Sequence, residues 1–163
     1  MELLEAIRTR RSIRSFTGAP IPRKDLETIV ESARLAPSGH NEQPWEFIVV
    51  TDHDLIDELT MAAGWMDKAG AIIAVVLDPS SRWWLEDGSA AVSNILLAAH
   101  ALGYGACWVE GNVLPLEERF KKLLGIPDGR RMPILVPIGV PDETPYKEKK
   151  TLAEIVHWDK YAV

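Results

Sequence analysis

A nearly all-apolar stretch, residues 87–103, constrains the fold more than any other part of the chain. Its length and composition predict a helix, and over most of it the only polar residues are Ser93, Asn94 and His100. A helix that is apolar on almost every side has to be buried on almost every side. In a chain of 163 residues, such a helix must be central or lie at a subunit interface, where its alanines would allow close helix packing.

Charge and composition narrow the classes of partner. Apolar residues make up 47% of the chain and charged residues 26%, which is typical of a globular domain and argues against disorder. The formal charge of −6 argues against general nucleic-acid binding, and no stretch approaches the ~18 apolar residues of a membrane span. Cys107 is the only cysteine, and the N-terminus lacks a signal-peptide pattern. We expect one domain over residues 1–163, in the cytoplasm, without nucleic-acid or membrane partners.

Apolar periodicity predicts the other elements. Helices are expected over residues 3–7, 24–36, 52–59 and 115–124, and continuous apolar strands over residues 47–50, 71–77, 106–109 and 134–140. Asp52 is a suitable N-cap, Gly125 is a suitable C′ residue, and Thr151 with Glu154 has the spacing of a capping box. Strands without alternation are typical of sheets that are covered on both faces. Pro137 within the last strand indicates an edge position or a bulge.

Arginines gather near the N-terminus of this acidic chain. Arg8, Arg10, Arg11 and Arg14 are four of its 18 lysines and arginines. The guanidinium group binds phosphate and other planar anions through paired, charge-assisted hydrogen bonds, and Ser12 adds a hydroxyl donor. These residues therefore predict a site for a phosphate-bearing cofactor. The alternative is a solvated basic helix end that offsets the helix dipole, and the segment alone does not decide between the two.

Three further polar segments follow buried elements. Residues 37–43 form a turn-rich loop in which Asn41 and Gln43 carry groups suited to hydroxyls or ring amides. Turn chemistry alone explains Asn41 well and Gln43 poorly. Residues 109–112 follow a predicted strand. The tail carries lysines at positions 147, 149 and 150, for which a solvated tail is the favoured interpretation from the residues alone.

Other kinds of site find no support in the sequence. The four histidines are scattered, and none pairs with Cys107 or a carboxylate at metal-ligand spacing. His100 on the apolar helix is expected to be a core histidine, and Cys107 a buried thiol. The nucleophile-elbow, P-loop and dinucleotide-binding glycine motifs are missing as well. We therefore expect no metal and no catalytic side chain.

Four segments together resemble the FMN-dependent nitroreductase family. They are RRSIRSF at residues 10–16, APSGHNEQPWEF at 36–47, LLAAHALGYG at 96–105 and IVHW at 155–158. One segment would be weak evidence, but all four occur in the family's order, and the resemblance extends from about residue 2 to residue 160. It implies an α+β fold with a mostly antiparallel central sheet flanked by helices. It also implies an intertwined homodimer that holds FMN at its interface.

The resemblance assigns a role to the arginine segment and to the tail. Arg10, Arg11 and Ser12 would hold the FMN phosphate and ribityl chain. Arg14 would lie near the N1/O2 edge of the flavin, where a fixed cation favours the negatively charged, reduced cofactor and so promotes hydride acceptance. The tail would complete the phosphate site through Lys147 and Lys149, or Lys150 if the register differs by one residue.

Two loops would supply the remaining contacts. Pro37 and Ser38 would come from the other subunit and cover the dimethylbenzene side of the ring, and Asn41 and Gln43 would contact the ribityl chain or the ring. The turn of Val109, Glu110 and Gly111 would lie along the ring. In that arrangement a backbone N–H of Glu110 or Gly111 would reach N5 and O4.

We therefore expect an NAD(P)H-dependent FMN oxidoreductase. Reduced nicotinamide would deliver hydride to flavin N5 and be replaced by a nitroaromatic, quinone or similar acceptor, in a ping-pong cycle that needs no catalytic side chain. The alternatives are an oxygen-using or dehalogenating flavoprotein of the same fold and a non-catalytic, flavin-binding redox sensor. Four side chains would either wall a substrate slot or pack in the core or dimer interface: Trp65, Met66, Trp83 and Trp84.

Overall fold

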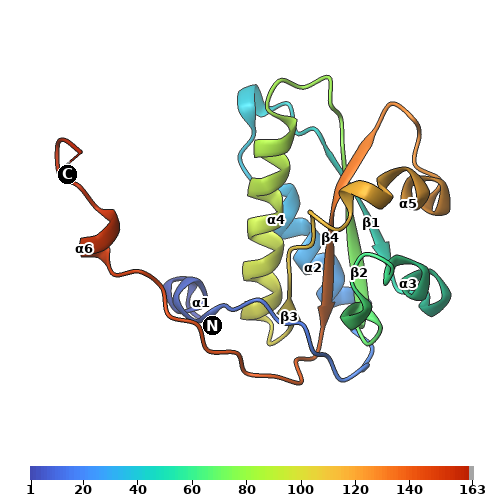
Figure 1. The fold of residues 1–163 in the computed structure, drawn as a ribbon, viewed down its shortest axis with the longest axis horizontal. Helices are drawn as coiled ribbons and strands as arrows, with labels where there is room; N and C mark the ends of the chain where they lie inside the picture. Colours follow the sequence, from blue (N-terminus) through green and yellow to red (C-terminus); the bar gives the residue numbers. More distant parts are fainter. Residues whose placement is uncertain (162–163) are drawn as a thin grey trace.

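The computed structural model describes residues 1–161, which form a four-stranded antiparallel sheet with helices against both faces (Figure 1). In chain order the strands are β1 (Trp45–Val50), β2 (Ala71–Leu77), β3 (Gly105–Ala106) and β4 (Arg131–Gly139). They lie in the order β1-β2-β4-β3, and every neighbouring pair is antiparallel. The expected α+β class with an antiparallel sheet is therefore confirmed.

Pro137 lies in an interior strand, so the expected edge position is wrong. β4 pairs with β2 on one side and with β3 on the other. The Pro137 carbonyl accepts a bond from the Cys107 N–H at 3.3 Å, on the β3 side. In an antiparallel strand the N and the carbonyl of one residue face the same neighbour, so the missing N–H also faces this side. The ladder is interrupted there, between Ala106 and the isolated bridge from Val109 to Leu135.

Six α-helices accompany the sheet in the described residues, and the predicted end signals are present. The Asp52 carboxylate accepts bonds from two backbone N–H groups of the next turn, Gly125 is left-handed with φ 69°, and Thr151 and Glu154 form the capping box. The helices are α1 (Leu3–Thr9), α2 (Arg23–Arg34), α3 (His53–Leu59), α4 (Trp84–Ala101), α5 (Glu117–Leu124) and α6 (Leu152–Ile155).

Two hydrophobic cores cover the two faces of the sheet. Ile73 of β2 belongs to a core shared with α2 and α4, which includes Ile95. Ile72, which points to the other face, belongs to a core shared with α3 and α5, which includes Phe120. Every residue of β2 is buried. The prediction that continuous apolar strands are covered on both faces is confirmed.

The long helix α4 is buried on one side only. Val92, Ile95 and Ala99 are fully buried toward the sheet and α2. The opposite side, which carries Ser93 and Ala101, is exposed. The expectation that this helix is buried all round is therefore not met within one protomer.

Two other apolar surfaces of the protomer are open. Leu3, Leu4 and Ile7 on α1 are all more than half exposed, with Leu4 at 77%. After β4 the chain runs past α1 and away from the sheet to α6 (Figure 1). Along this tail Ile155 and Trp158 are exposed as well. Apolar surfaces of this kind favour association with another chain.

Candidate functional site

The arginine segment lies beside β3, at the C-terminal end of α4. Ser12 forms a parallel bridge with Ala106, and the Ile13 N–H donates to the Ala106 carbonyl at 3.1 Å. A Cβ on Gly105 would lie 2.7 Å from the Ile13 Cβ, so this close approach requires glycine. The pairing fixes the path of the segment against the sheet.

Cys107 is a buried thiol directly after Ala106, the residue that pairs with Ser12. Burial raises the pKa of this thiol most strongly, while Arg14, a hydrogen bond from Ser12, and Arg10 lower it. The net pKa lies above its ordinary value, so the thiol stays protonated at neutral pH. Ser12 and the two arginines therefore all affect this thiol, and the roles that the resemblance gives them stay predictions.

Arg10 has a donor that no protein group satisfies. Its Nη1 atom is buried, and no hydrogen bond in the described part of the chain uses it. A buried guanidinium donor without a partner is unfavourable, and an anion is the partner it suits best. Nearby, His100 is hydrogen-bonded to Thr9 at 2.8 Å. Burial lowers the pKa of His100 and Arg10 lowers it further, so His100 adds no positive charge at neutral pH.

Arg11 and Arg14 differ from Arg10 in their surroundings. The Nη1 group of Arg11 donates to the carbonyls of Arg8 and Arg10, both at 2.9 Å, at the end of α1. Arg11 thus binds carbonyl groups at the C-terminal end of α1, which agrees in part with the alternative of a basic helix end. Arg14 is exposed, its guanidinium lies 6.0 Å from the centre of the Trp65 ring, and its backbone N–H donates to Glu143.

The segment after β3 offers two unused backbone donors. Val109 exchanges hydrogen bonds with Leu135 at 3.0 and 2.9 Å, which fixes the segment against β4. The Glu110 carboxylate accepts a bond from the Trp108 indole at 3.1 Å. Within residues 1–161, no hydrogen bond uses the backbone N–H of Glu110 or of Gly111. These two N–H groups are free to bind a ligand.

Residues 38–43 form a strained loop. His40, Asn41 and Gln43 have φ values of 50°, 59° and 50°, which is the left-handed region that non-glycine residues rarely adopt. Each such residue costs about 1 to 3 kcal/mol, so the conformation persists only where the surrounding structure holds it. Bonds within the loop include Gln43 N–H to Ser38 Oγ at 3.1 Å. Strain of this kind gathers at functional sites, and no sequence pattern indicated it here.

Gly39 ties this loop to the N-terminal end of α4. Its N–H donates to the Asp87 carboxylate at 3.0 Å. A Cβ on Gly39 would lie 2.2 Å from the Trp83 ring, so the loop packs against the indole in a way that only glycine allows. No sequence pattern indicated Asp87, because an acidic residue in the first turn of a helix is ordinary and carries no further signal.

The two groups of predicted site residues lie at opposite ends of α4. The arginine segment lies beside Gly105, after the helix, and Thr9 contacts His100 in its last turn. Residues 37–43 contact Asp87 in the first turn. At a rise of about 1.5 Å per residue, the helix from Asp87 to His100 spans about 20 Å. One protomer therefore does not bring the two groups together.

Pro37, Ser38, Asn41 and Gln43 share one loop. Their predicted contacts must therefore come from the same subunit. Lys147 and Lys149 lie exposed on the tail, and in the described residues no hydrogen bond or ion pair joins them to the arginine segment.

The four side chains that could wall a substrate slot or pack in the core have different surroundings. Met66 is fully buried, so its suggested place in a substrate slot is wrong and it belongs to the core. Trp84 packs against the core and lies under Arg131, with 5.3 Å between guanidinium carbon and ring centre. Trp83 contacts the strained loop. Trp65 is half-buried beside Arg14, the one of the four that lies next to the arginine segment.

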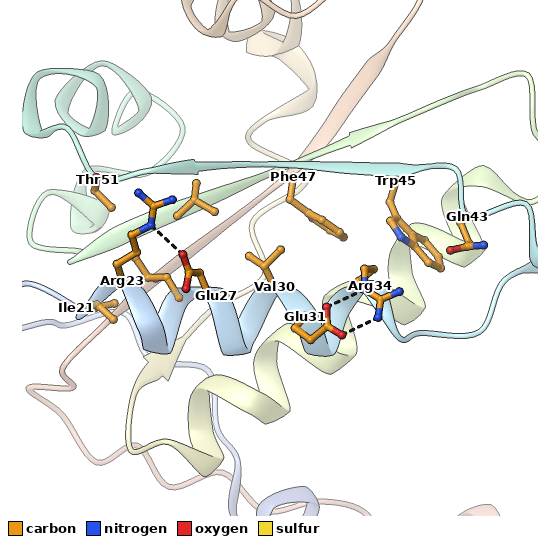
Figure 2. Close-up of a pocket in the computed structure, with 12 residues that line it drawn as sticks. Ile21, Arg23, Glu27, Val30, Glu31, Arg34, Gln43, Trp45, Phe47 and Thr51 are labelled. Atoms are coloured by element: carbon orange, nitrogen blue, oxygen red, sulfur yellow. Dashed lines mark hydrogen bonds and ion pairs between the residues drawn. The ribbon is translucent and has the colours of Figure 1, made fainter.

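A groove that the sequence did not predict lies between α2 and β1. It has a volume of about 790 Å³, and Figure 2 shows Trp45 and Phe47 of β1 facing Val30 of α2 across it. The exposed ion pairs of Arg23 with Glu27 and of Arg34 with Glu31 lie along the helix that forms one wall. β1 is the free edge of the sheet in the described chain.

Residues 1–161 contain neither a metal-binding group nor a helix that could span a membrane. In these residues, no group of three or more His, Cys, Asp or Glu side chains is arranged to hold a metal ion. None of the described helices has the length and apolar character needed to cross a membrane.

Comparison with known proteins identifies the relatives of this chain. Residues 7–68 and 57–140 match the model of the nitroreductase family. A protein of Archaeoglobus fulgidus, provisionally named an NADH dehydrogenase/NAD(P)H nitroreductase, is 43% identical over 159 residues, which cover 90% of each chain. By class, the protein is an NAD(P)H-dependent oxidoreductase. The chain belongs to the nitroreductase family.

Solved structures agree with this assignment. A protein from Parabacteroides distasonis with the same provisional name superposes with a TM-score of 0.90 at 30% identity over 98% of each chain. An FMN-dependent nitroreductase from Clostridium difficile superposes with a TM-score of 0.88 at 27% identity, over 97% of this chain and 99% of the other. The fold is thus that of a nitroreductase.

Proposed function

We propose that the protein is an FMN-dependent oxidoreductase of the cytoplasm. It would take hydride from NAD(P)H and pass it to a nitroaromatic, quinone or similar acceptor in a ping-pong cycle. The observation that carries the proposal is the buried, unpartnered Nη1 of Arg10, on the same segment as Ser12 and Arg14, in a chain with formal charge −6. A donor set of this kind fits the phosphate end of FMN. The solved FMN-dependent relative supports the choice of cofactor.

The protein's own residues would bind and orient the cofactor. Arg10 and Ser12 would donate to the phosphate and ribityl chain. The unused N–H groups of Glu110 and Gly111 would donate to acceptors on the ring edge. Arg14, exposed beside Trp65, would place a fixed positive charge near the ring. When bound, FMN supplies the group that accepts and donates hydride at N5, so no acid or base side chain is required.

The site would be completed by a second copy of the chain. The arginine segment and residues 37–43 lie at opposite ends of α4, so they do not form one compact site within a protomer. A two-fold axis that pairs two α4 helices antiparallel would bring the loop of one subunit to the arginine segment of the other. Lys147 and Lys149, or Lys150, would then reach the phosphate from a tail that leaves the protomer body (Figure 1).

The open apolar surfaces support this assembly. The exposed side of α4 has small residues that allow close helix packing, and the apolar residues of α1 are uncovered. The partner's tail, with its exposed Ile155 and Trp158, would cover the groove beside β1, because a free edge strand needs protection from unwanted pairing. An intertwined homodimer would account for all these surfaces.

The experiment that tests the proposal is an absorbance spectrum of the purified protein, followed by anaerobic reduction with NADH and then NADPH. We expect a yellow protein whose flavin absorbance bleaches with at least one nicotinamide and returns when a quinone or nitro compound is added. A protein that is colourless, and stays so after FMN is added, would contradict the proposal. Flavin that is reduced but not reoxidised by any acceptor would favour the redox-sensor alternative.

A further inference from the structure

The strained loop needs an anchor outside itself. Three of its residues are left-handed without being glycine, and its internal bonds join residues at most five positions apart. Local bonds of this kind can form in many loop conformations, so they do not select the strained one. A contact from a rigid element is required to hold the loop where it is.

Asp87 provides that contact from the first turn of α4. Its Oδ1 atom accepts the Gly39 N–H at 3.0 Å, and the side chain is only 6% exposed. The second oxygen, Oδ2, is buried and has no hydrogen-bond partner among the described residues. The bond to Gly39 is therefore the one polar contact of this carboxylate within residues 1–161. A buried carboxylate with a single bond is unfavourable for stability alone, so its place calls for another explanation.

We infer that Asp87 is a positioning residue that holds residues 38–43 in their strained conformation for binding of the cofactor. The anchor is rigid because α4 is the longest described helix and is buried on one side in the core. The ring of Trp83, one turn away, also packs closely against Gly39. Through this loop, Asp87 acts on the flavin site without touching the cofactor. The inference rests on the proposed function, in which Ser38, Asn41 and Gln43 contact FMN.

The main alternative is that Asp87 only stabilises α4 by its charge near the helix N-terminus. The two roles differ in what a substitution does to the loop. Asp87→Asn keeps an acceptor oxygen of the same shape for the Gly39 N–H, but removes the charge. Asp87→Ala removes both. If the loop depends on the acceptor oxygen, residues 38–43 should largely keep their strained conformation in Asp87→Asn and lose it in Asp87→Ala.

The test measures two quantities in the wild type and in each variant. One is the rate of amide hydrogen exchange of residues 38–43 in the flavin-free protein, and the other is the dissociation constant for FMN. We expect Asp87→Ala to speed exchange in this loop at least tenfold and to raise the dissociation constant at least tenfold. Asp87→Asn should change both by about threefold, because a neutral acceptor bonds more weakly than a charged one. Asp57→Ala, which removes an exposed carboxylate on α3 at the other face of the sheet, is the control and should change neither.

A second control separates positioning from general loosening. Tyr104 donates to Asp25 at 2.6 Å, which ties the chain after α4 to α2, far from the loop. Tyr104→Phe should lower thermal stability without changing exchange in residues 38–43. Equal exchange in the loop for Asp87→Ala and wild type would overturn the inference, as would equal losses in Asp87→Asn and Asp87→Ala. If wild-type protein bound no FMN, the proposed function would fail, whereas the exchange data would still decide what Asp87 does to the loop.

Discussion

Arg10 and Arg14 lie on the same segment but are expected to affect different steps. Arg10 has a buried, unpartnered donor, so Arg10→Ala should weaken FMN binding by roughly tenfold or more, the loss expected for a charge-assisted bond. Arg14 is exposed beside Trp65, so Arg14→Ala should slow flavin reduction by about tenfold and change FMN affinity much less. Fluorescence titration and stopped-flow reduction measure the two quantities.

Arg8 offers a matched control for this division. It is exposed and lies outside the residues that resemble the family's phosphate site. Arg8→Ala should leave both the FMN dissociation constant and the reduction rate near the wild-type values. Equal losses of affinity and rate in Arg10→Ala and Arg14→Ala would contradict the separate roles.

Glu117 should make the fold sensitive to acid. It is 6% exposed and accepts bonds from Arg131 at 2.8 and 2.9 Å and from the Met132 N–H at 2.7 Å. Burial alone would raise the pKa of Glu117, but these bonds outweigh it and hold the pKa below its ordinary value. Because the folded pKa is the lower one, the stabilisation is complete above the unfolded pKa of about 4.3 and is lost as the pH falls through the folded value.

Glu117→Gln tests whether the ionised Glu117 carboxylate stabilises the fold. At pH 7 the substitution should lower the free energy of unfolding by about 2 kcal/mol, and the difference from wild type should shrink as the pH falls below about 4. Glu27→Gln breaks the exposed pair with Arg23 and should change the free energy by less than about 0.5 kcal/mol. Urea unfolding at fixed protein concentration measures both, and a pH-independent effect of Glu117→Gln would contradict the account.

Single residues with local signals could be predicted from the sequence. Asp52, Gly125 and the Thr151–Glu154 pair were assigned correctly because caps depend on neighbours along the chain. The backbone of Gln43 could not be predicted, because its left-handed φ follows from contacts around the loop. Asp87 was missed for the same reason, since its partner Gly39 is far away in sequence.

At the scale of elements, periodicity predicted which helices and strands exist better than where they end. α4 begins at Trp84 rather than residue 87, because the apolar pattern starts only after its first turn. The expected strand over residues 106–109 is reduced to Gly105–Ala106 and a separate bridge at Val109. The partner strand has Pro137 there, and its missing N–H interrupts the ladder. Such an effect depends on strand pairing, which the sequence alone does not reveal.

The open side of α4 leads to a prediction about assembly. Ser93→Arg places a long charged side chain on this side, where the second subunit is proposed to pack closely. The dimer dissociation constant should rise by roughly tenfold or more, since a large charge at a close-packed interface has no partner. Sedimentation velocity over a concentration series measures it. Asp57→Arg, on α3 at the other face of the sheet, should leave assembly unchanged, and an unaffected Ser93→Arg dimer would contradict the interface.

At the scale of the whole molecule, the class of fold followed from the resemblance of four segments to a known family. The resemblance also implied that Pro37 and Ser38 come from the other subunit, but no sequence pattern states that residues 37–43 and 10–14 lie at opposite ends of one helix, which divides the site. That division is the strongest reason to propose shared sites. In the proposed dimer, each protomer would contribute one half to each of the two cofactor sites.

Subunit complementation tests this central claim most directly. One chain carries Arg10→Ala and the other carries Ser38→Ala with Gln43→Ala, with different tags so that mixed dimers can be purified. Each variant alone should bind little FMN. If sites are shared, a mixed dimer has one site with all defects and one intact site, and it should bind about half as much FMN as wild type. A mixed dimer that binds no more FMN than either variant alone would contradict the account.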